Sequence, residues 1–154
     1  MITQPLQDTS LRHHLGSIAR DGIDIFLLGD GQVRGAVVHA SRMVNQMRRN
    51  HRLGLLETLI LGHGYIAAAL LTAQVKGNDK IRLAIECDGP ARGLSVESRA
   101  TGAVRGYLYR VPIPLETPPE SFDISPFLGG GTLSVTKELE VARHPFTGAI
   151  ELEE

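Results

Sequence analysis

The chain has 154 residues, of which 42% are hydrophobic and 21% charged, and its formal net charge is −1. These values are typical of one globular domain with a real core, and they exclude a disordered chain. Cys87 is the only cysteine, which excludes an internal disulfide and a four-thiolate zinc site within these residues and favours a reducing, cytoplasmic setting. We therefore expect a single domain over residues 1–154.

The first forty residues predict a short helix followed by a β-hairpin. Residues 6–20 are polar with spaced apolar side chains, which is typical of a short helix or of an ordered segment leading into the fold. Two strand-like runs, 23–28 and 33–40, flank Gly29-Asp30-Gly31. Because glycine adopts positive φ without steric cost, this turn between two such runs predicts a hairpin.

Two central helices follow. Ser41 is a candidate N-cap for a helix over 42–51, and a longer helix is expected over 55–74. The second helix is apolar on nearly every side, so we expect it between two layers of the fold. Glu57 and the glycines around His63 interrupt its apolar run, which favours a buried helix over a membrane span.

From Lys80 onwards the hydrophobic period changes to two, which predicts strands. Residues 112–126 are rich in proline and are expected to form an extended loop, and Pro145-Phe146-Thr147-Gly148 a turn. The fold class is therefore α+β, an antiparallel sheet meander packed on two central helices. The expected strands cover 80–86, 94–96, 104–111, 132–141 and 149–152.

A series of short motifs runs through the chain in the order Val33-Arg34-Gly35, Leu70-Leu71-Thr72-Ala73, Asp88-Gly89-Pro90, Leu94-Ser95-Val96, Gly102-Ala103-Val104-Arg105-Gly106-Tyr107, Gly131-Thr132-Leu133-Ser134-Val135 and Phe146-Thr147-Gly148-Ala149-Ile150. In this order the motifs resemble the amino-terminal core of the 33-kDa heat-shock protein family, over about residues 23–152. The resemblance implies a cytosolic, redox-regulated holdase chaperone, which binds unfolded or misfolded client proteins through apolar surface. It implies no enzyme activity.

The chain departs from this family at the redox switch. The family holds zinc with one Cys-x-Cys and one Cys-x-x-Cys pair, and Cys87 matches none of these positions. We therefore expect no cofactor in this chain and no redox regulation carried by these residues. Two explanations remain, a fragment of a longer chaperone or a naturally short relative, and we favour a fragment that is incomplete at its carboxy end. Uncovered apolar surface would then favour a homodimer or higher self-association.

No catalytic or metal-binding constellation is expected, because the histidines are scattered and His63 is interpreted as a core residue. The candidate partner-binding residues lie on the first central helix. Flexible thioethers suit an adaptable client surface, although core packing is the simpler interpretation of both methionines. The basic residues of 42–52 suggest an alternative, a small nucleic-acid-binding module, which the neutral net charge and the 5% aromatic content disfavour. The candidates are Met43, Met47, Arg48 and Arg49.

Overall fold

The main layer of the protein is a five-stranded antiparallel sheet with the order β5-β4-β3-β6-β7. A computed structural model describes residues 4–115 and 121–153. Strand β3 lies at the centre and pairs with β4 on one side and β6 on the other, so β5 and β7 are the two edges. The strands are β3 (Lys80–Cys87), β4 (Gly93–Arg99), β5 (Val104–Leu108), β6 (Gly131–Glu138) and β7 (Phe146–Leu152).

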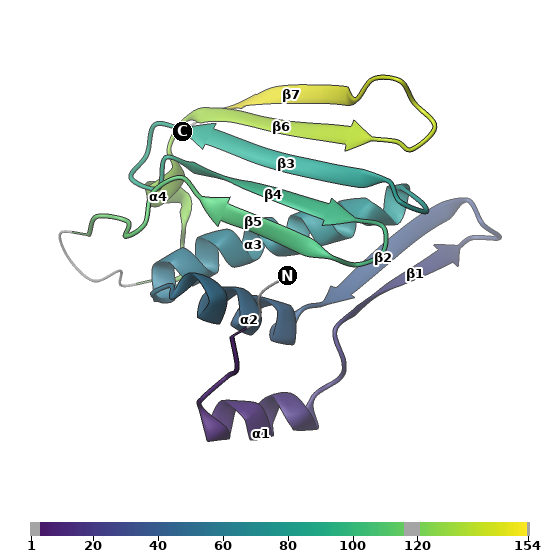
Figure 1. The fold of residues 1–154 in the computed structure, drawn as a ribbon. Helices are drawn as coiled ribbons and strands as arrows, with labels where there is room; N and C mark the ends of the chain where they lie inside the picture. The colour runs from purple at the N-terminus through teal and green to yellow at the C-terminus, as the bar shows by residue number, and fades with distance from the viewer. Residues whose placement is uncertain (1–3, 116–120, 154) are drawn as a thin grey trace.

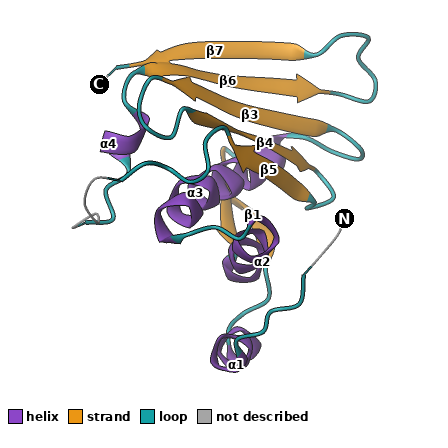
Figure 2. Cartoon of the chain, turned by 60° about the vertical axis from the view of Figure 1, so that its left-hand side comes forward, coloured by secondary structure: helices purple, strands orange, loops and turns teal. Residues whose placement is uncertain are grey.

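Helices α1 to α3 and a separate hairpin lie on one face of this sheet (Figures 1 and 2). Helix α3 crosses the sheet and packs against β3, β4 and β5. Helix α2 packs on the other side of α3, and the β1–β2 hairpin extends from the same layer (Figure 1). These elements are α1 (Thr9–Ser17), β1 (Gly22–Leu28), β2 (Val33–His39), α2 (Ser41–His51), α3 (Leu55–Leu71) and the 3₁₀ turn η1 (Thr72–Gln74).

Helix α3 is the centre of the apolar core. Leu61 is fully buried and Ile60 is 1% exposed. At Gly64 a Cβ atom would lie 3.0 Å from Leu94 Cδ1, so glycine lets the helix approach the sheet closely. The segment Leu55–Gln74 is long and apolar enough to cross a membrane, but 56% of its most apolar window is buried. It packs between the sheet and α2, as expected of the core helix of a soluble protein.

The predicted fold class is confirmed, because the helices pack together against an antiparallel sheet. The hairpin is also confirmed, with positive φ at Gly29, Asp30 and Gly31. The strands do not form a simple meander throughout, since β6 returns to pair with β3. The hairpin forms a second, two-stranded sheet. That residues 1–154 form one domain stays a prediction.

Three local predictions were wrong or incomplete. Ser41 does not cap α2, because Ala40 occupies the cap position and no side chain of the cap residue bonds there. The segment predicted as a turn at Pro145 begins β7 instead, where Phe146 pairs with Lys137 across the ladder. The predicted loop 112–126 contains the start of a short helix, α4 (Ser125–Leu128), and its residues 116–120 lie outside the described residues.

Candidate functional site

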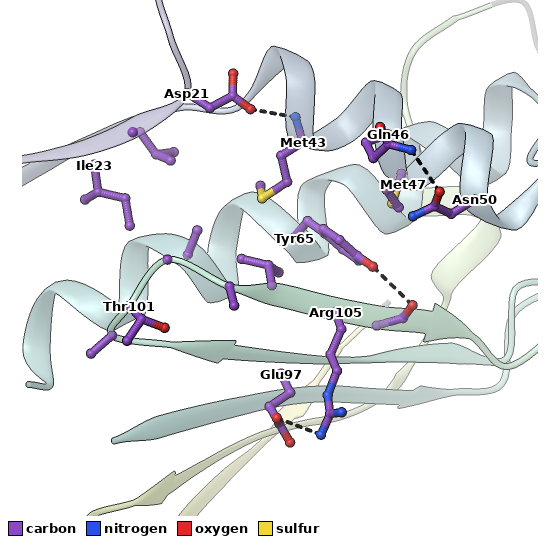
Figure 3. Close-up of a pocket in the computed structure, with 18 of the residues that line it drawn as sticks. Asp21, Ile23, Met43, Gln46, Met47, Asn50, Tyr65, Glu97, Thr101 and Arg105 are labelled. Atoms are coloured by element: carbon purple, nitrogen blue, oxygen red, sulfur yellow. Dashed lines mark hydrogen bonds and ion pairs between the residues drawn. The ribbon is translucent and has the colours of Figure 1, made fainter. Parts of the chain in front are cut away.

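A cleft of about 1230 Å³ separates the β5 edge of the sheet from the layer of α2 and the hairpin (Figure 3). One side is formed by the strand edge and the turn before it. The opposite side comes from the hairpin and α2, with α3 between them, and its apolar side chains, which we call the apolar wall, lie among the polar side chains of Asp21, His39, Gln46, Asn50 and His51. The apolar residues lining the cleft include Ile23, Val38, Met43, Met47, Tyr65 and Ala69.

Asp21 fixes the position of the apolar wall. Its Oδ1 accepts a hydrogen bond from the Arg42 N–H at 3.0 Å, and its Oδ2 accepts one from the Met43 N–H (Figure 3). These are unpaired donors of the first turn of α2, so a residue just before β1 acts as the cap of a helix that follows β2. The carboxylate thereby ties the base of the hairpin to the start of α2.

Tyr65 joins the floor of the cleft to the sheet. Its hydroxyl donates a hydrogen bond to the Gly106 carbonyl oxygen at 3.3 Å (Figure 3). Burial raises the pKa of Tyr65, against a smaller lowering effect of the hydrogen bond at Gly106. The hydroxyl therefore stays protonated at neutral pH and remains a donor.

Charged side chains on the outer face of the sheet also line the cleft, namely Arg82, Glu97 and Arg105. Arg105 Nη2 lies 2.9 Å from Glu97 Oε1, and Arg82 Nη2 lies 3.7 Å from Glu97 Oε2. Burial alone would raise the pKa of Glu97, but the Arg105 guanidinium, with Lys80 and Arg82, holds that pKa below its ordinary value. The basic side chains are thus partly neutralised within the sheet.

The β1–β2 hairpin exposes apolar side chains on both of its faces, and we call it the apolar ribbon. The side chains of successive strand residues point to opposite faces. Leu27 is 63% exposed on one face, and Val37 is 56% exposed on the other. The exposed apolar residues of the ribbon are Ile25, Phe26, Leu27, Leu28, Val33 and Val37. Such surface is expected where a protein contacts another molecule.

Comparisons with known proteins identify the family. Residues 21–154 match the family model described as Hsp33 protein. The chain belongs to the Hsp33 family.

Individual proteins of this family are also similar to the chain. The chain is 35% identical over 124 residues to a 33 kDa chaperonin of Desulforamulus reducens, covering 80% of this chain and 42% of that protein. It is 36% identical over 126 residues to a 33 kDa chaperonin of Aquifex aeolicus, covering 78% and 38%. The crystal structure of the 33 kDa chaperonin of Thermotoga maritima superimposes with a TM-score of 0.76 at 31% identity, covering 84% of this chain and 45% of that one. The chain thus spans about two fifths of the length of these relatives, and the resemblance inferred from the motifs is confirmed.

The structure divides the four predicted partner-binding residues of this Hsp33 chain into two pairs. Met43 and Met47 line the cleft, although Met47 is only 2% exposed and belongs to the core cluster. Arg48 is exposed and Arg49 half-buried, and neither lines the cleft. Their role in binding a partner stays a prediction. His63 is exposed, so its interpretation as a core residue was wrong; its Nδ1 lies 2.7 Å from the Leu59 carbonyl oxygen.

The basic residues of α2 do not form one free face. The Arg42 guanidinium donates to the Leu15 carbonyl oxygen of α1, so one of its hydrogen-bond donors is already used within the chain. Arg52 follows the helix with a φ of 54°, so its backbone has already left the helical path. The nucleic-acid alternative stays a prediction without a supporting contact here.

The described residues contain no group of three or more histidine, cysteine or acidic side chains arranged to hold a metal. A zinc site of four thiolates does not fit a sequence with Cys87 as its single cysteine. Burial raises the pKa of the Cys87 thiol, and the charge of Asp88 acts in the same direction. The thiolate, which is the reactive form, is therefore disfavoured at neutral pH.

The sequence did not reveal the apolar ribbon as a candidate site. A signal was present in Ile25-Phe26-Leu27-Leu28, an apolar run that a half-buried strand would interrupt with polar residues. Continuous apolar strands are usually buried on both faces, so the run alone does not distinguish a core strand from an exposed binding strand.

Proposed function

We propose that this chain is a client-binding part of a cytoplasmic Hsp33-type holdase chaperone. It would bind unfolding polypeptides through apolar surface and release them unchanged. The names of the relatives support a chaperone. This chain spans about two fifths of their length and would supply the part that contacts the client.

The apolar ribbon is the observation that carries the proposal. Burying apolar surface contributes roughly 25 cal/mol per Å², independently of the order of side chains in the partner. A ribbon with exposed apolar side chains on both faces can therefore gain free energy from many different unfolded chains. Only Asp24 and Arg34 place charge on its two strands, so little opposes such contacts.

We further propose that client binding by these residues is not switched by oxidation. Cys87 is the only thiol, so peroxide cannot form a disulfide within one chain. Its raised pKa, due first to burial, also slows reaction with peroxide because the thiolate is the nucleophile. The zinc chemistry of the family would require cysteines outside these residues.

The test is light scattering of a thermally unfolding client in the presence of excess chain. The expected result is suppressed scattering, which weakens when Leu27→Ser and Val37→Ser remove apolar surface from both faces of the ribbon. The matched control is Val141→Ser, because Val141 is 94% exposed in the loop between β6 and β7. Unchanged client aggregation with the unmodified chain in excess would refute the holdase proposal.

An oxidation arm tests the regulation separately. The chain is treated with hydrogen peroxide before the assay, in parallel with Cys87→Ser. We expect the same suppression in all four combinations of variant and treatment. An increase in suppression that requires both peroxide and Cys87 would show that the lone thiol is a switch after all.

A further inference from the structure

Strand β5 directs toward the cleft a row of backbone groups that do not pair with β4. Arg99 N–H donates to the Ala103 carbonyl oxygen, and Tyr109 N–H donates to the Gly93 carbonyl oxygen, so residues 103, 105, 107 and 109 direct their backbone groups toward β4. The intervening residues Val104, Gly106 and Leu108 direct theirs outward. Tyr65, which donates to the Gly106 carbonyl oxygen, is the one partner of these outward groups within the described residues.

This edge lacks most of the features by which proteins protect a sheet edge. Natural edges carry lysine, proline, bulges or inward-pointing charges, or are covered by another element. The only charged residue of β5 is Arg105, and it is paired with Glu97 on the outer face. Beyond the edge lies the cleft, whose opposite wall combines apolar side chains with the amides of Gln46 and Asn50. The edge therefore faces a space that can accept a further strand.

The opposite wall already binds the backbone of one residue near the start of the chain, Gln4. Asn50 Oδ1 accepts a hydrogen bond from the Gln4 N–H at 3.1 Å, and Gln46 Nε2 donates to the Gln4 carbonyl oxygen at 2.8 Å. Gln46 Nε2 also donates to Asn50 Oδ1 at 2.9 Å (Figure 3). Both amides belong to the lining of the cleft. The two amides thus bind the backbone N–H and the carbonyl oxygen of Gln4, and this contact does not depend on the side chain at that position.

We propose that the cleft binds an extended polypeptide segment as an added strand on β5, which is a specific site for the clients of the proposed function. Main-chain hydrogen bonds to Val104, Gly106 and Leu108 would supply affinity for any sequence, as in β-augmentation. Every second side chain of the segment would face the wall of Ile23, Met43 and other apolar residues. The site therefore favours segments with an apolar residue at alternate positions and excludes proline where a donor must reach β5.

The inference rests on the proposed function for its ligand, an unfolded polypeptide, but its test is separate. The probe is a fluorescein-labelled peptide of about ten residues in which valine alternates with threonine, long enough at about 3.3 Å per residue to span β5. Backbone amide hydrogen exchange of the chain is measured with and without saturating peptide. We expect exchange at Val104, Gly106 and Leu108 to slow about tenfold, with the amides of β7, the opposite edge, unchanged.

Two chemically modified peptides separate backbone pairing from side-chain contact. One peptide is methylated on the backbone nitrogens of its valines and the other on those of its threonines. Because alternate residues of a strand direct their N–H groups to opposite edges, each modified peptide lacks the donors of one edge and keeps every side chain. At least one of them should bind about tenfold more weakly, since two or three hydrogen bonds are lost. Equal affinity of both modified peptides and the parent would overturn the added-strand geometry.

Two substitutions test whether the peptide binds in the cleft. Met43→Lys introduces a charge into the apolar wall and should weaken peptide binding about tenfold or more. Val141→Lys makes the same kind of change on an exposed loop away from the cleft and should leave affinity unchanged. Circular dichroism verifies that both variants fold. If Met43→Lys does not fold, the exchange experiment on the unmodified chain still tests the site.

The outcomes distinguish this inference from the proposed function. Suppressed client aggregation without protection of the β5 amides would leave the holdase proposal intact and overturn the β5 site. Protection of those amides by the peptide without any effect on client aggregation would establish the peptide site and refute the holdase proposal. Protection confined to the apolar ribbon would also overturn the β5 site.

Discussion

At the scale of single residues, Asp21 shows how one side chain fixes the position of a helix that lines the cleft. Helix α2 begins at Ser41 after Ala40, which has no side chain able to cap the first turn. Asp21 supplies both missing acceptors from the residue before β1. The apolar wall therefore depends on one carboxylate that the sequence places far from the helix it caps.

Replacing Asp21 by alanine should lower the free energy of unfolding by about 1–2 kcal/mol, because two N-terminal donors of α2 lose their acceptor. Urea denaturation of the purified variant measures the change. The matched control is Asp24→Ala on β1, where the exposed carboxylate caps no helix. Equal effects of the two substitutions would contradict the capping role of Asp21.

Glu97 links stability to pH. Its folded pKa lies below the ordinary value because the nearby arginines favour the carboxylate more than burial opposes it. A depressed pKa contributes stability above the unfolded-state pKa, and this contribution is lost as pH falls through the folded pKa. Acidification should therefore remove the stabilisation supplied by Glu97.

The corresponding experiment compares Glu97→Gln with the unmodified chain by urea denaturation from about pH 7 to pH 3. The variant should be less stable by up to about 1 kcal/mol at neutral pH, with the difference vanishing at the acidic end. Glu86→Gln, an exposed carboxylate on the same face of the sheet, serves as the control. A difference for Glu97→Gln that stays constant across the pH range would rule out the linkage.

At the scale of elements, local chemistry explains which predictions succeeded. The hairpin was predictable because Gly29-Asp30-Gly31 requires the positive φ values that it adopts. Helix α3 was predictable from its apolar composition. The start of β7 was missed because Phe146 and Thr147 follow a proline, whereas their strand conformation depends on pairing with Lys137 and Thr136.

The cleft was less predictable than the fold. Met43 and Met47 were named on the basis of their residue type, and both line it. The β5 edge and the amides of Gln46 and Asn50 were not named, because their significance depends on which strand ends the sheet and which backbone reaches the helix. Single-sequence patterns carry no direct information on either point.

Two glycines of α3 allow its packing to be measured. A Cβ atom at Gly64 would approach Leu94 Cδ1 and Val96 Cγ2 at 3.0 and 3.2 Å, between side chains that are themselves buried. A Cβ atom at Gly62 would meet only Val44, at 3.3 Å from its nearer methyl group, and Val44 is half-buried. The sheet side of the helix is therefore the tighter one.

We expect Gly64→Ala to be less stable than Gly62→Ala by about 1–2 kcal/mol, because overpacking a buried contact forces neighbouring side chains to shift. Both substitutions gain the same helix propensity, about 1 kcal/mol, so their difference isolates the packing. Thermal and urea unfolding of the two variants provide the comparison. The reverse order would mean that the contact with α2, not the one with the sheet, limits the approach of α3.

At the scale of the whole molecule, two of the exposed apolar surfaces in the described residues belong to β-sheets. The apolar ribbon is one. The other is the part of the sheet that extends beyond α3, where Phe146 and Ile150 are each 60% exposed on the face that packs against the helix elsewhere. A hairpin of two strands is only marginally stable in water by itself. Of the two surfaces, the ribbon should therefore gain more stability when another molecule covers it.

We therefore expect the chain to self-associate at micromolar concentration, with the apolar ribbon at the contact. Sedimentation velocity should show a dimer or larger species that shifts toward monomer in the double variant Leu27→Asp, Val37→Asp, since charge on both faces opposes burial. Val141→Asp, an equally drastic change outside the ribbon, should leave the distribution unchanged. A monomer over the whole concentration range would mean that the ribbon stays uncovered in solution and is free for clients. A species that persists in the double variant would instead place the contact elsewhere, with the exposed face of β6 and β7 the next surface to substitute.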